Sequence, residues 1–283
     1  GYIFIAPSLV LILIFAVIPI FMSFFFSFTK YNILQSPEWV GLKNYVRLFK
    51  DPYVVDSLKN TLLYTAMVVP LQTIFSMTVA ALIAAKFRNR FGRFVKGMMF
   101  VPVISSTVLV GTLWSVMLAT DGGIINAFLG WFGASPINWL GSSKTALLGV
   151  CAAAIWKNVG YFLVIFYAGI MNIPGHLYEA AEVDGASYLQ SFFHITLPSL
   201  KPITFMVMTL GMIWSFQVFD LVYTMTNGGP GRSTITLVLT IYNAAFKERN
   251  MGFASAVAVL MFCIVMIVSA IQKFCFGEKG EKE

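Results

Sequence analysis

The sequence predicts an all-α integral membrane protein with six transmembrane helices, folded as a single domain over residues 1–283. Hydrophobic residues make up 58% of the chain and charged residues only 11%, whereas a soluble domain carries about 25% charged residues. Six apolar runs divide the chain, and each exceeds the roughly 20 residues that a helix needs to cross a hydrocarbon layer about 30 Å thick. The runs are continuously apolar, which argues against the alternating strands of a membrane β-barrel.

The six predicted helices follow from the positions of these runs. Four runs are uncharged, a fifth contains only Lys157, and another continues through a single carboxylate, Asp220. The apolar part of the first run is too long for a signal peptide, and no small-residue cleavage site followed by a soluble body comes after it. We therefore take it as the first helix. In chain order the runs cover residues 1–29, 60–85, 97–120, 145–171, 202–226 and 250–272.

The orientation of the helices is predicted from one short basic connection. Residues 86–96 contain five Lys and Arg side chains, and such density is typical of a cytoplasmic loop under the positive-inside rule. The connection at 172–201 and both termini would then be cytoplasmic as well. Anionic lipid headgroups explain the net charge of +7 better than nucleic acid does.

The sequence contains no pattern that indicates catalysis, a metal site or a bound cofactor. Cys151, Cys263 and Cys275 lie in or beside apolar helices without paired spacing, so we interpret them as packing residues. His176 and His194 are not arranged as zinc ligands. Phosphate-binding loops and dinucleotide fingerprints are also absent from the sequence, so ATP and Mg²⁺, if used, would be bound by separate ATPase subunits.

An acidic, alanine-rich segment lies in the connection at 172–201. Residues 179–186 are EAAEVDGA, and they hold three of the 12 acidic residues of the chain. Helix formers at 176–183 follow Pro174, Gly185 interrupts them, and a second helix is predicted at 187–195. Small alanines allow another protein to approach closely, and carboxylates can pair with its Arg or Lys. An ordinary interfacial amphipathic helix is the alternative, but that kind of helix favours basic residues on its polar face.

This segment resembles the cytoplasmic signature of the permease subunits of binding-protein-dependent ATP-binding-cassette importers. That signature is EAA, three residues, Gly, nine residues, then Ile, any residue, Leu and Pro. The segments GLKNYVRLFKD at 41–51 and NGGP at 227–230 look like the carbohydrate-uptake branch, similar to maltose and glycerol-phosphate permeases. The signature positions are Glu179, Ala180, Ala181, Gly185, Ile195, Leu197 and Pro198.

The resemblance implies a type I importer permease fold in a bacterial cell membrane. Its expected partners are a second permease subunit, forming a heterodimer, two ATPase subunits, and an extracytoplasmic sugar-binding protein. The EAA segment would be a coupling helix in a cleft of the ATPase, moving the transmembrane helices between inward-open and outward-open states. Trp39, Tyr45 and residues 227–230 are expected to meet the binding protein. The coupling residues would be Glu179, Ala180, Ala181, Asp184, Gly185 and Ala186.

Polar and aromatic residues inside the spans indicate a substrate pathway, because polar groups in lipid are costly and usually functional. The fourth helix carries Lys157, Asn158 and Tyr161. In the fifth, Trp214, Gln217 and Asp220 follow at spacings of three and would share one side of a helix. The resemblance adds Ser215 beside Trp214. Aromatic faces and amide or carboxylate groups suit a polyol substrate.

Other interpretations of these residues remain open at this stage. Lys157 and Asp220 could form a structural ion pair, Trp214 could contact another subunit, and Tyr161 could simply pack. An importer of a polyamine or peptide is a second possibility, although a polyamine site should show several carboxylates in the spans. A membrane-embedded enzyme would need Lys157, Asp220, Glu179 and His194 at one depth, but the last two are in the connection outside the bilayer.

Overall fold

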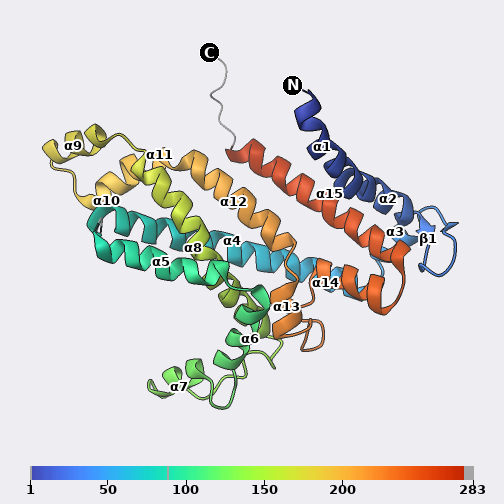
Figure 1. Cartoon of the computed structure of the whole chain (residues 1–283). Helices are drawn as coiled ribbons and strands as arrows, with labels where there is room; N and C mark the ends of the chain where they lie inside the picture. Colours follow the sequence, from blue (N-terminus) through green and yellow to red (C-terminus); the bar gives the residue numbers. More distant parts are fainter. Residues whose placement is uncertain (1, 88, 277–283) are drawn as a thin grey trace.

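The computed structural model describes residues 2–87 and 89–276 as a bundle of long helices (Figure 1). Within these ranges, four helical segments are long and apolar enough to span a membrane, and two bent helix pairs bring the number to six. The prediction of six spans is confirmed when each bent pair counts as one span.

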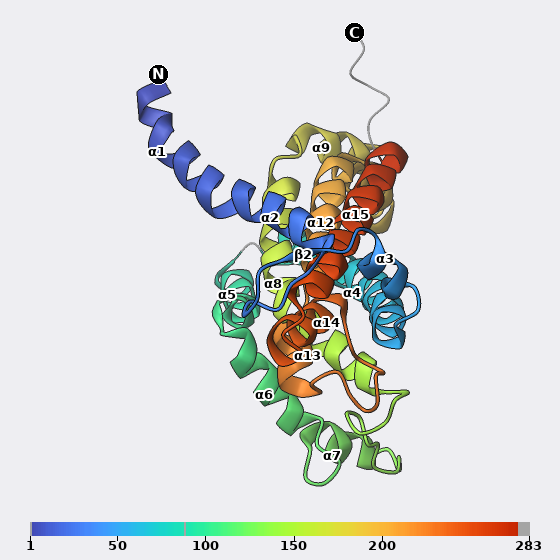
Figure 2. The same cartoon turned by 90° about the vertical axis from the view of Figure 1, so that its right-hand side faces the viewer.

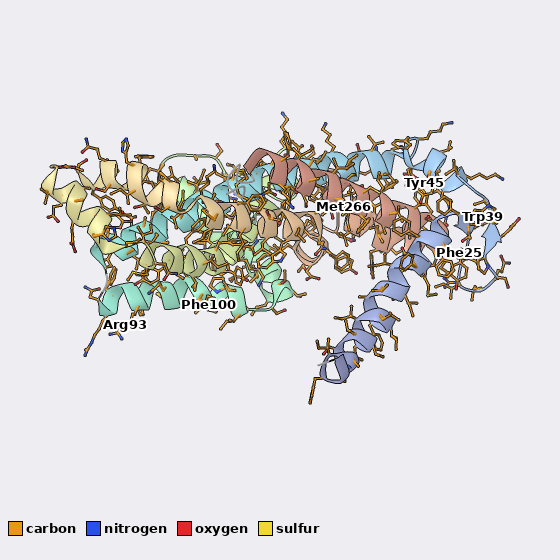
Figure 3. All side chains as sticks on the ribbon, turned by 90° about the horizontal axis from the view of Figure 1, so that it is seen from above. Phe25, Trp39, Tyr45, Arg93, Phe100 and Met266 are labelled. Atoms are coloured by element: carbon orange, nitrogen blue, oxygen red, sulfur yellow. The ribbon has the colours of Figure 1, made fainter. Side chains whose placement is uncertain are left out.

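The first span consists of α1 (Tyr2–Ile12), the π-helical turn η1 (Leu13–Val17) and α2 (Ile18–Ser27). The span that can cross a membrane runs from Phe4 to Ser27, and its most apolar 18 residues include none that the rest of the chain buries, whereas Ser27 at its end is fully buried. Only α2 packs against another long helix, α15 (Met251–Phe276), so the first half of the span diverges from the bundle (Figures 2 and 3).

A small aromatic cap follows the first span. Strands β1 (Thr29–Lys30) and β2 (Glu38–Trp39) form an antiparallel ribbon that precedes α3 (Lys43–Leu48). The Trp39 ring stacks on Phe28 at 5.5 Å, and the Tyr45 hydroxyl lies 2.6 Å from the Ser27 hydroxyl. These contacts hold the loop on the end of the first span.

The centre of the bundle is the pair α4 (Pro52–Lys86) and α8 (Ala146–Met171). The second span therefore starts at Pro52, well before the predicted residue 60, because Asp51 caps the helix by accepting a hydrogen bond from the Tyr53 N–H at 3.0 Å. The prediction began later because it followed uncharged runs, and the first turns of α4 contain charged residues. The pair buries two apolar clusters, one around Val68 and Val150 and one around Phe162 and Phe166.

The third span is broken, contrary to the prediction of one helix over 97–120. Helix α5 (Arg90–Ile104) and helix α6 (Thr107–Met117) meet at 103°. Ser105 adopts an extended backbone with ψ of 145°, which ends α5 directly after its internal Pro102. The short α7 (Ile124–Gly130) follows in the next connection.

The fifth span is also interrupted. A short entry helix, α10 (Tyr188–Ser191), η2 (Phe192–Thr196) and α11 (Leu197–Ser199), meets α12 (Lys201–Phe216) at 66°. Helix α12 ends at Phe216, so the predicted continuation to residue 226 is wrong; α13 (Asp220–Met225) begins after a break.

Before the last span, the chain adds a short apolar helix that the sequence analysis did not single out. This is α14 (Leu237–Tyr242), continued by η3 (Asn243–Lys247) and packed against α4 and α15. The loop before it is anchored by Asn60, whose amide donates to the carbonyls of Arg232 and Ile235 at 2.8 and 3.0 Å. An ion pair between Arg232 and Asp56 adds a second anchor and raises the pKa of the guanidinium.

Figures 2 and 3 show which elements lie toward each end of the molecule. Figure 2 shows α9 (Gly175–Val183), the start of α1 and the end of α15 at one end, with α7 at the opposite end. In Figure 3, Arg93 lies toward the end that carries α9, whereas Trp39 and Tyr45 lie together at the far end. The basic connection and the acidic segment therefore share one end of the molecule.

Candidate functional site

The acidic segment forms helix α9, as predicted, and a glycine ends it. Gly185 has a φ of +75°, a left-handed conformation in which glycine is favoured. The N–H groups of Gly185 and Ala186 donate to the carbonyls of Glu182 and Ala181 at 3.0 and 2.9 Å, the hydrogen-bond pattern of a Schellman motif. The glycine of the signature is therefore required by this turn.

The second helix of the connection starts with a capping box. The Ser187 N–H donates to the Gln190 side chain at 2.7 Å, and the Gln190 N–H donates to the Ser187 hydroxyl at 3.4 Å. The predicted helix, hinge and helix are thus all present, and the helix after the hinge leads through η2 and α11 toward α12.

The predicted coupling residues lie on α9 and on the turn that ends it, both of which project from the bundle. Helix α9 contains no buried residue. Glu179, Ala180, Asp184 and Gly185 are exposed, whereas Ala181 and Ala186 are half-buried. The carboxylates and most of these small side chains are therefore accessible from outside the chain.

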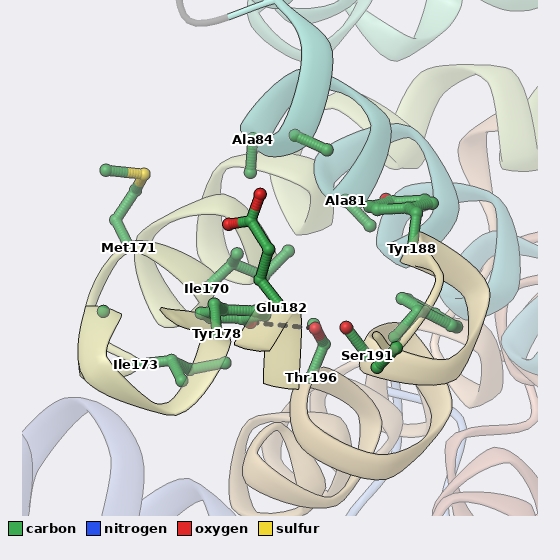
Figure 4. A pocket seen from close by; sticks show the side chains of 14 residues that line it. Ala81, Ala84, Ile170, Met171, Ile173, Tyr178, Glu182, Tyr188, Ser191 and Thr196 are labelled. Carbon is green, nitrogen blue, oxygen red and sulfur yellow. Dashed lines mark hydrogen bonds between the residues drawn. The ribbon is translucent and has the colours of Figure 1, made fainter. Parts of the chain in front are cut away.

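Behind α9 lies a cavity of about 680 Å³ between the acidic connection and the ends of α4 and α8 (Figure 4). The Glu182 carboxylate points into it toward Ala84, away from Tyr178. At the border of the cavity, the Tyr178 and Thr196 hydroxyls lie 2.8 Å apart, within hydrogen-bond distance. The cavity therefore separates most of α9 from the bundle.

Lys157 does not form the ion pair with Asp220 that was one of the alternatives. Its ammonium donates to the carbonyls of Pro102, Val103 and Ser105 at 3.3, 3.4 and 2.8 Å. These are carbonyls at the broken end of α5, where free acceptors and the helix dipole favour a cation. Within the described residues, ion pairs occur only elsewhere. The charge is balanced by backbone carbonyls, which sequence reasoning could not anticipate.

Gly160, one turn beyond Lys157, lets α5 approach α8 closely. A Cβ at this position would lie 1.9 Å from the Met99 carbonyl oxygen and 2.6 Å from its carbon. Both atoms belong to the backbone and cannot rotate away. The glycine therefore sets the distance at which Lys157 reaches the end of α5.

Asn158 also makes an internal contact. Its amide donates to the Gln72 side chain at 3.2 Å, while Ser76 on the same face of α4 donates to the Val159 carbonyl at 3.1 Å. Gln72 is fully buried, and its own amide nitrogen lacks a partner and faces the space left by Gly211. Gln72 was not among the predicted site residues, although a side-chain amide in the middle of an apolar run indicates a functional or pairing role.

The aromatic residues of the predicted pathway do come together. The Tyr161 and Trp214 rings are 5.0 Å apart, and Trp214 also contacts Phe162 at 5.4 Å. Trp214 is 39% exposed, so one face of this pair is open. Ser215, in contrast, is 3% exposed and packs inside the bundle, where it cannot contact a ligand in this conformation.

Gln217 and Asp220 are exposed, but the prediction that they share one helix side with Trp214 is wrong. Gln217 caps the end of α12, and Asp220 is the first residue of α13. The break between them redirects the chain. Trp214 and Gln217 therefore mark the end of one helix, and Asp220 marks the start of another.

The residues that a membrane-embedded enzyme would need do not lie together in one site. His194 contacts the Gln190 carbonyl in the acidic connection, whereas Lys157 contacts the end of α5. Among the described residues, His, Cys, Asp and Glu form no group of three that could hold a metal ion. Cys151 and Cys263 are free thiols, the first buried and the second exposed; the side chain of Cys275 lies outside the described part.

Comparison with known proteins identifies the family. Residues 76–275 match the family described as the inner membrane component of binding-protein-dependent transport systems. A probable ABC transporter permease protein YurN of Bacillus subtilis is 35% identical, covering 100% of this chain and 97% of its own length. The trehalose/maltose transport permease MalF of Thermococcus litoralis is 32% identical over 94% of this chain and 90% of its own length.

Solved structures show the same fold. A chain of a bacterial ABC transporter that imports the acidic polysaccharide alginate superimposes with a TM-score of 0.86. It shares 21% identity, covering 99% of this chain and 96% of that one. The six-span architecture, the projecting acidic helix and the sequence match lead to one conclusion. The chain belongs to the family of inner membrane components of binding-protein-dependent transport systems, and it is a permease subunit of an ABC importer.

Proposed function

We propose that this permease subunit moves a sugar or oligosaccharide, delivered by an extracytoplasmic binding protein, into the cell by alternating access. The observation that carries the carbohydrate assignment is similarity along the whole chain to permeases named for sugars. They include an arabinooligosaccharide permease of Bacillus subtilis, 33% identical over 99% of this chain, and a sulfoquinovosyl glycerol permease of Agrobacterium fabrum, 32% identical over 94%.

Helix α9 is the proposed contact with the ATPase subunits, which would bind ATP and Mg²⁺. Its exposed surface combines the Glu179 and Asp184 carboxylates with small alanines. A charged hydrogen bond to a partner's Arg or Lys would hold the helix while the alanines allow close contact. Movement of the ATPase subunits would then displace α9 and the helices joined to it.

The exposed apolar surface of the first span suggests that another membrane subunit packs against it. The most apolar 18 residues of this span include none that the described chain buries, and α1 diverges from the other helices (Figure 2). A second permease subunit, different from this one, is the proposed partner, with lipid covering the remaining surface. The proposed orientation places α9, the basic connection and both termini in the cytoplasm, because the dense basic connection follows the positive-inside rule and Arg93 lies toward the end of the molecule that carries α9 (Figure 3). Trp39, Tyr45 and residues 227–230 would then face the binding protein outside.

The proposed substrate contacts are Tyr161, Trp214 and Gln217, with Asp220 at the next helix start. The open face of the aromatic pair can cover a sugar ring, and the exposed Gln217 amide can bond hydroxyl groups. A few such contacts bind weakly, which suits a transporter that must release its cargo. Lys157 and Asn158 would contribute indirectly by holding α5 and α4 against α8.

The substitutions Tyr161→Ala and Gln217→Ala test this site. Each should lower uptake by the assembled importer, while basal ATP hydrolysis and assembly with the partner subunits stay unchanged. Substituting the exposed Leu148 of α8 by Ala provides a control. If both variants transport at the normal rate and with normal selectivity, the substrate site lies elsewhere.

A second test addresses the solute class. The polyamine and peptide alternatives predict that the cognate binding protein binds those solutes, whereas the proposal predicts binding of a sugar or oligosaccharide. Calorimetric titration of the binding protein with the three classes separates them. A binding protein that takes only a polyamine or a peptide would refute the carbohydrate assignment.

A further inference from the structure

The projecting helix α9 touches the rest of the chain at very few points. It has no buried residue, and a cavity separates it from the ends of α4 and α8. Along the chain, it connects to α8 through residues 172–174 and to α10 through residues 184–187. Among the described residues, its side-chain hydrogen bond to another element joins the hydroxyls of Tyr178 and Thr196 at 2.8 Å (Figure 4).

Thr196 belongs to a firmly packed part of the molecule. It is 5% exposed and is the last residue of the π-helical turn η2. Its carbonyl accepts the Leu200 N–H at 3.0 Å, and Leu200 is fully buried at the start of α12. A displacement applied to the Thr196 side chain therefore acts directly on the base of α12.

The covalent route from α9 to α12 is much less direct. It passes through Gly185, whose left-handed turn has no neighbour within 4 Å of a Cβ position, and then through the exposed Ser187. Such a turn can absorb a displacement by small changes in φ and ψ. The last turn of α12 carries Trp214, and Gln217 caps it. Both are proposed substrate contacts, so displacement of α12 would reach the substrate site.

We infer that the hydrogen bond between Tyr178 and Thr196 transmits displacement of α9 to α12, bypassing the glycine turn. Both are positioning residues, since neither touches the substrate or ATP. The inference rests on the proposed function of α9 as the contact with the ATPase subunits. It assigns to Tyr178 and Thr196 a role distinct from docking, because both side chains face the interior of the connection rather than the partner.

The assembled importer, with its binding protein and a transported sugar in proteoliposomes, provides the assay. Sugar uptake per ATP hydrolysed is measured for Tyr178→Phe, Thr196→Val and the double variant. Each single variant should lower this ratio about fivefold, equivalent to about 1 kcal/mol at 1.4 kcal/mol per factor of ten. The double variant should be no worse than either single one, as expected for two partners in one bond.

Two matched controls accompany these variants. Thr196→Ser keeps the hydroxyl and should retain the normal ratio. Tyr188 lines the same cavity from the other side and makes no hydrogen bond through its hydroxyl in the described structure, so Tyr188→Phe should also behave normally. All variants should copurify with the ATPase subunits in normal amounts and unfold within about 3 °C of the wild type, because one hydroxyl contact contributes only about 1 kcal/mol.

The outcomes separate this inference from the proposed function. Three outcomes would overturn the inference. The first is a normal ratio of uptake to ATP hydrolysis for Tyr178→Phe, and the second is a loss in the double variant equal to the product of the two single losses. The third is loss of ATPase copurification in either single variant. Glu179→Lys serves as the separate test of docking and should abolish copurification. If Glu179→Lys copurifies and transports normally, the proposed role of α9 fails, whatever the ratio for Tyr178→Phe.

Discussion

Replacing Lys157 by Met tests the idea that this lysine stabilises the broken end of α5. The side chain of Met has similar length but cannot donate, so the carbonyls of Pro102, Val103 and Ser105 would lose their shared cation. Losing the donor is costly for partly buried carbonyls to the extent that water cannot replace it. The variant should therefore loosen the bend between α5 and α6.

The size of the effect follows from two opposing contributions. Hydrogen bonds to a charged group stabilise by about 1.5–3 kcal/mol; the 2.8 Å bond to Ser105 belongs at the upper end, and the bonds at 3.3 and 3.4 Å are weaker. Taking about 3 kcal/mol for the first and about 1 for each of the others gives about 5 kcal/mol. Removing a charge from the bilayer returns about 3 kcal/mol. The net destabilisation is about 2 kcal/mol.

Thermal unfolding of the purified, assembled importer measures this loss. A net 2 kcal/mol should lower Tm by roughly 4 °C, taking about 2 °C for each kcal/mol in a chain of this size. Lys201→Met is a matched control, because Lys201 is exposed at the start of α12, and its Tm should not change. Uptake by Lys157→Met should fall as well, since α5 and α8 shift relative to each other.

The reasoning is refuted if Lys157→Met unfolds at the same temperature as Lys201→Met and the wild type. A double-mutant cycle with Asp220→Asn gives a second check. Since no ion pair joins the two side chains, their effects on unfolding should add to within about 0.5 kcal/mol. A larger coupling would show that Lys157 depends on the carboxylate after all.

Three further substitutions follow from the packing. Gly160→Ala should push α5 away from α8, because the new Cβ would meet the Met99 backbone. We expect the free energy of unfolding to fall by about 3 kcal/mol or more, measured by thermal unfolding. Gly97→Ala is the control and should be neutral, because space is open around Gly97. Gly185→Val should reduce ATPase copurification more than Gly185→Asn, because Asn tolerates a positive φ; equal behaviour would show that the turn tolerates any side chain. Asn60→Ala should cost about 2 kcal/mol, since two loop carbonyls lose their donor, and an unchanged Tm would contradict this.

Local features of the sequence were sufficient for a large part of the architecture. Six apolar runs predicted six spans, because crossing a bilayer depends mainly on length and composition. The turn at Gly185 and the helices on both sides of it were predicted from residue types within ten positions. The positions of Tyr161 and Trp214 were also close to what the structure shows, and their rings do meet.

The tertiary structure alone decided how the polar residues inside the bundle are paired. Lys157 bonds carbonyls about 50 positions earlier in the chain, and Asn158 bonds Gln72 on another helix. Ser215 is buried, although its neighbour Trp214 is exposed. The breaks after Ile104 and Phe216 likewise changed which side chains share a surface. Apolar composition predicts that a segment lies in the membrane. Each polar group in lipid must be paired within the protein, and the packing of the helices determines which partner it meets.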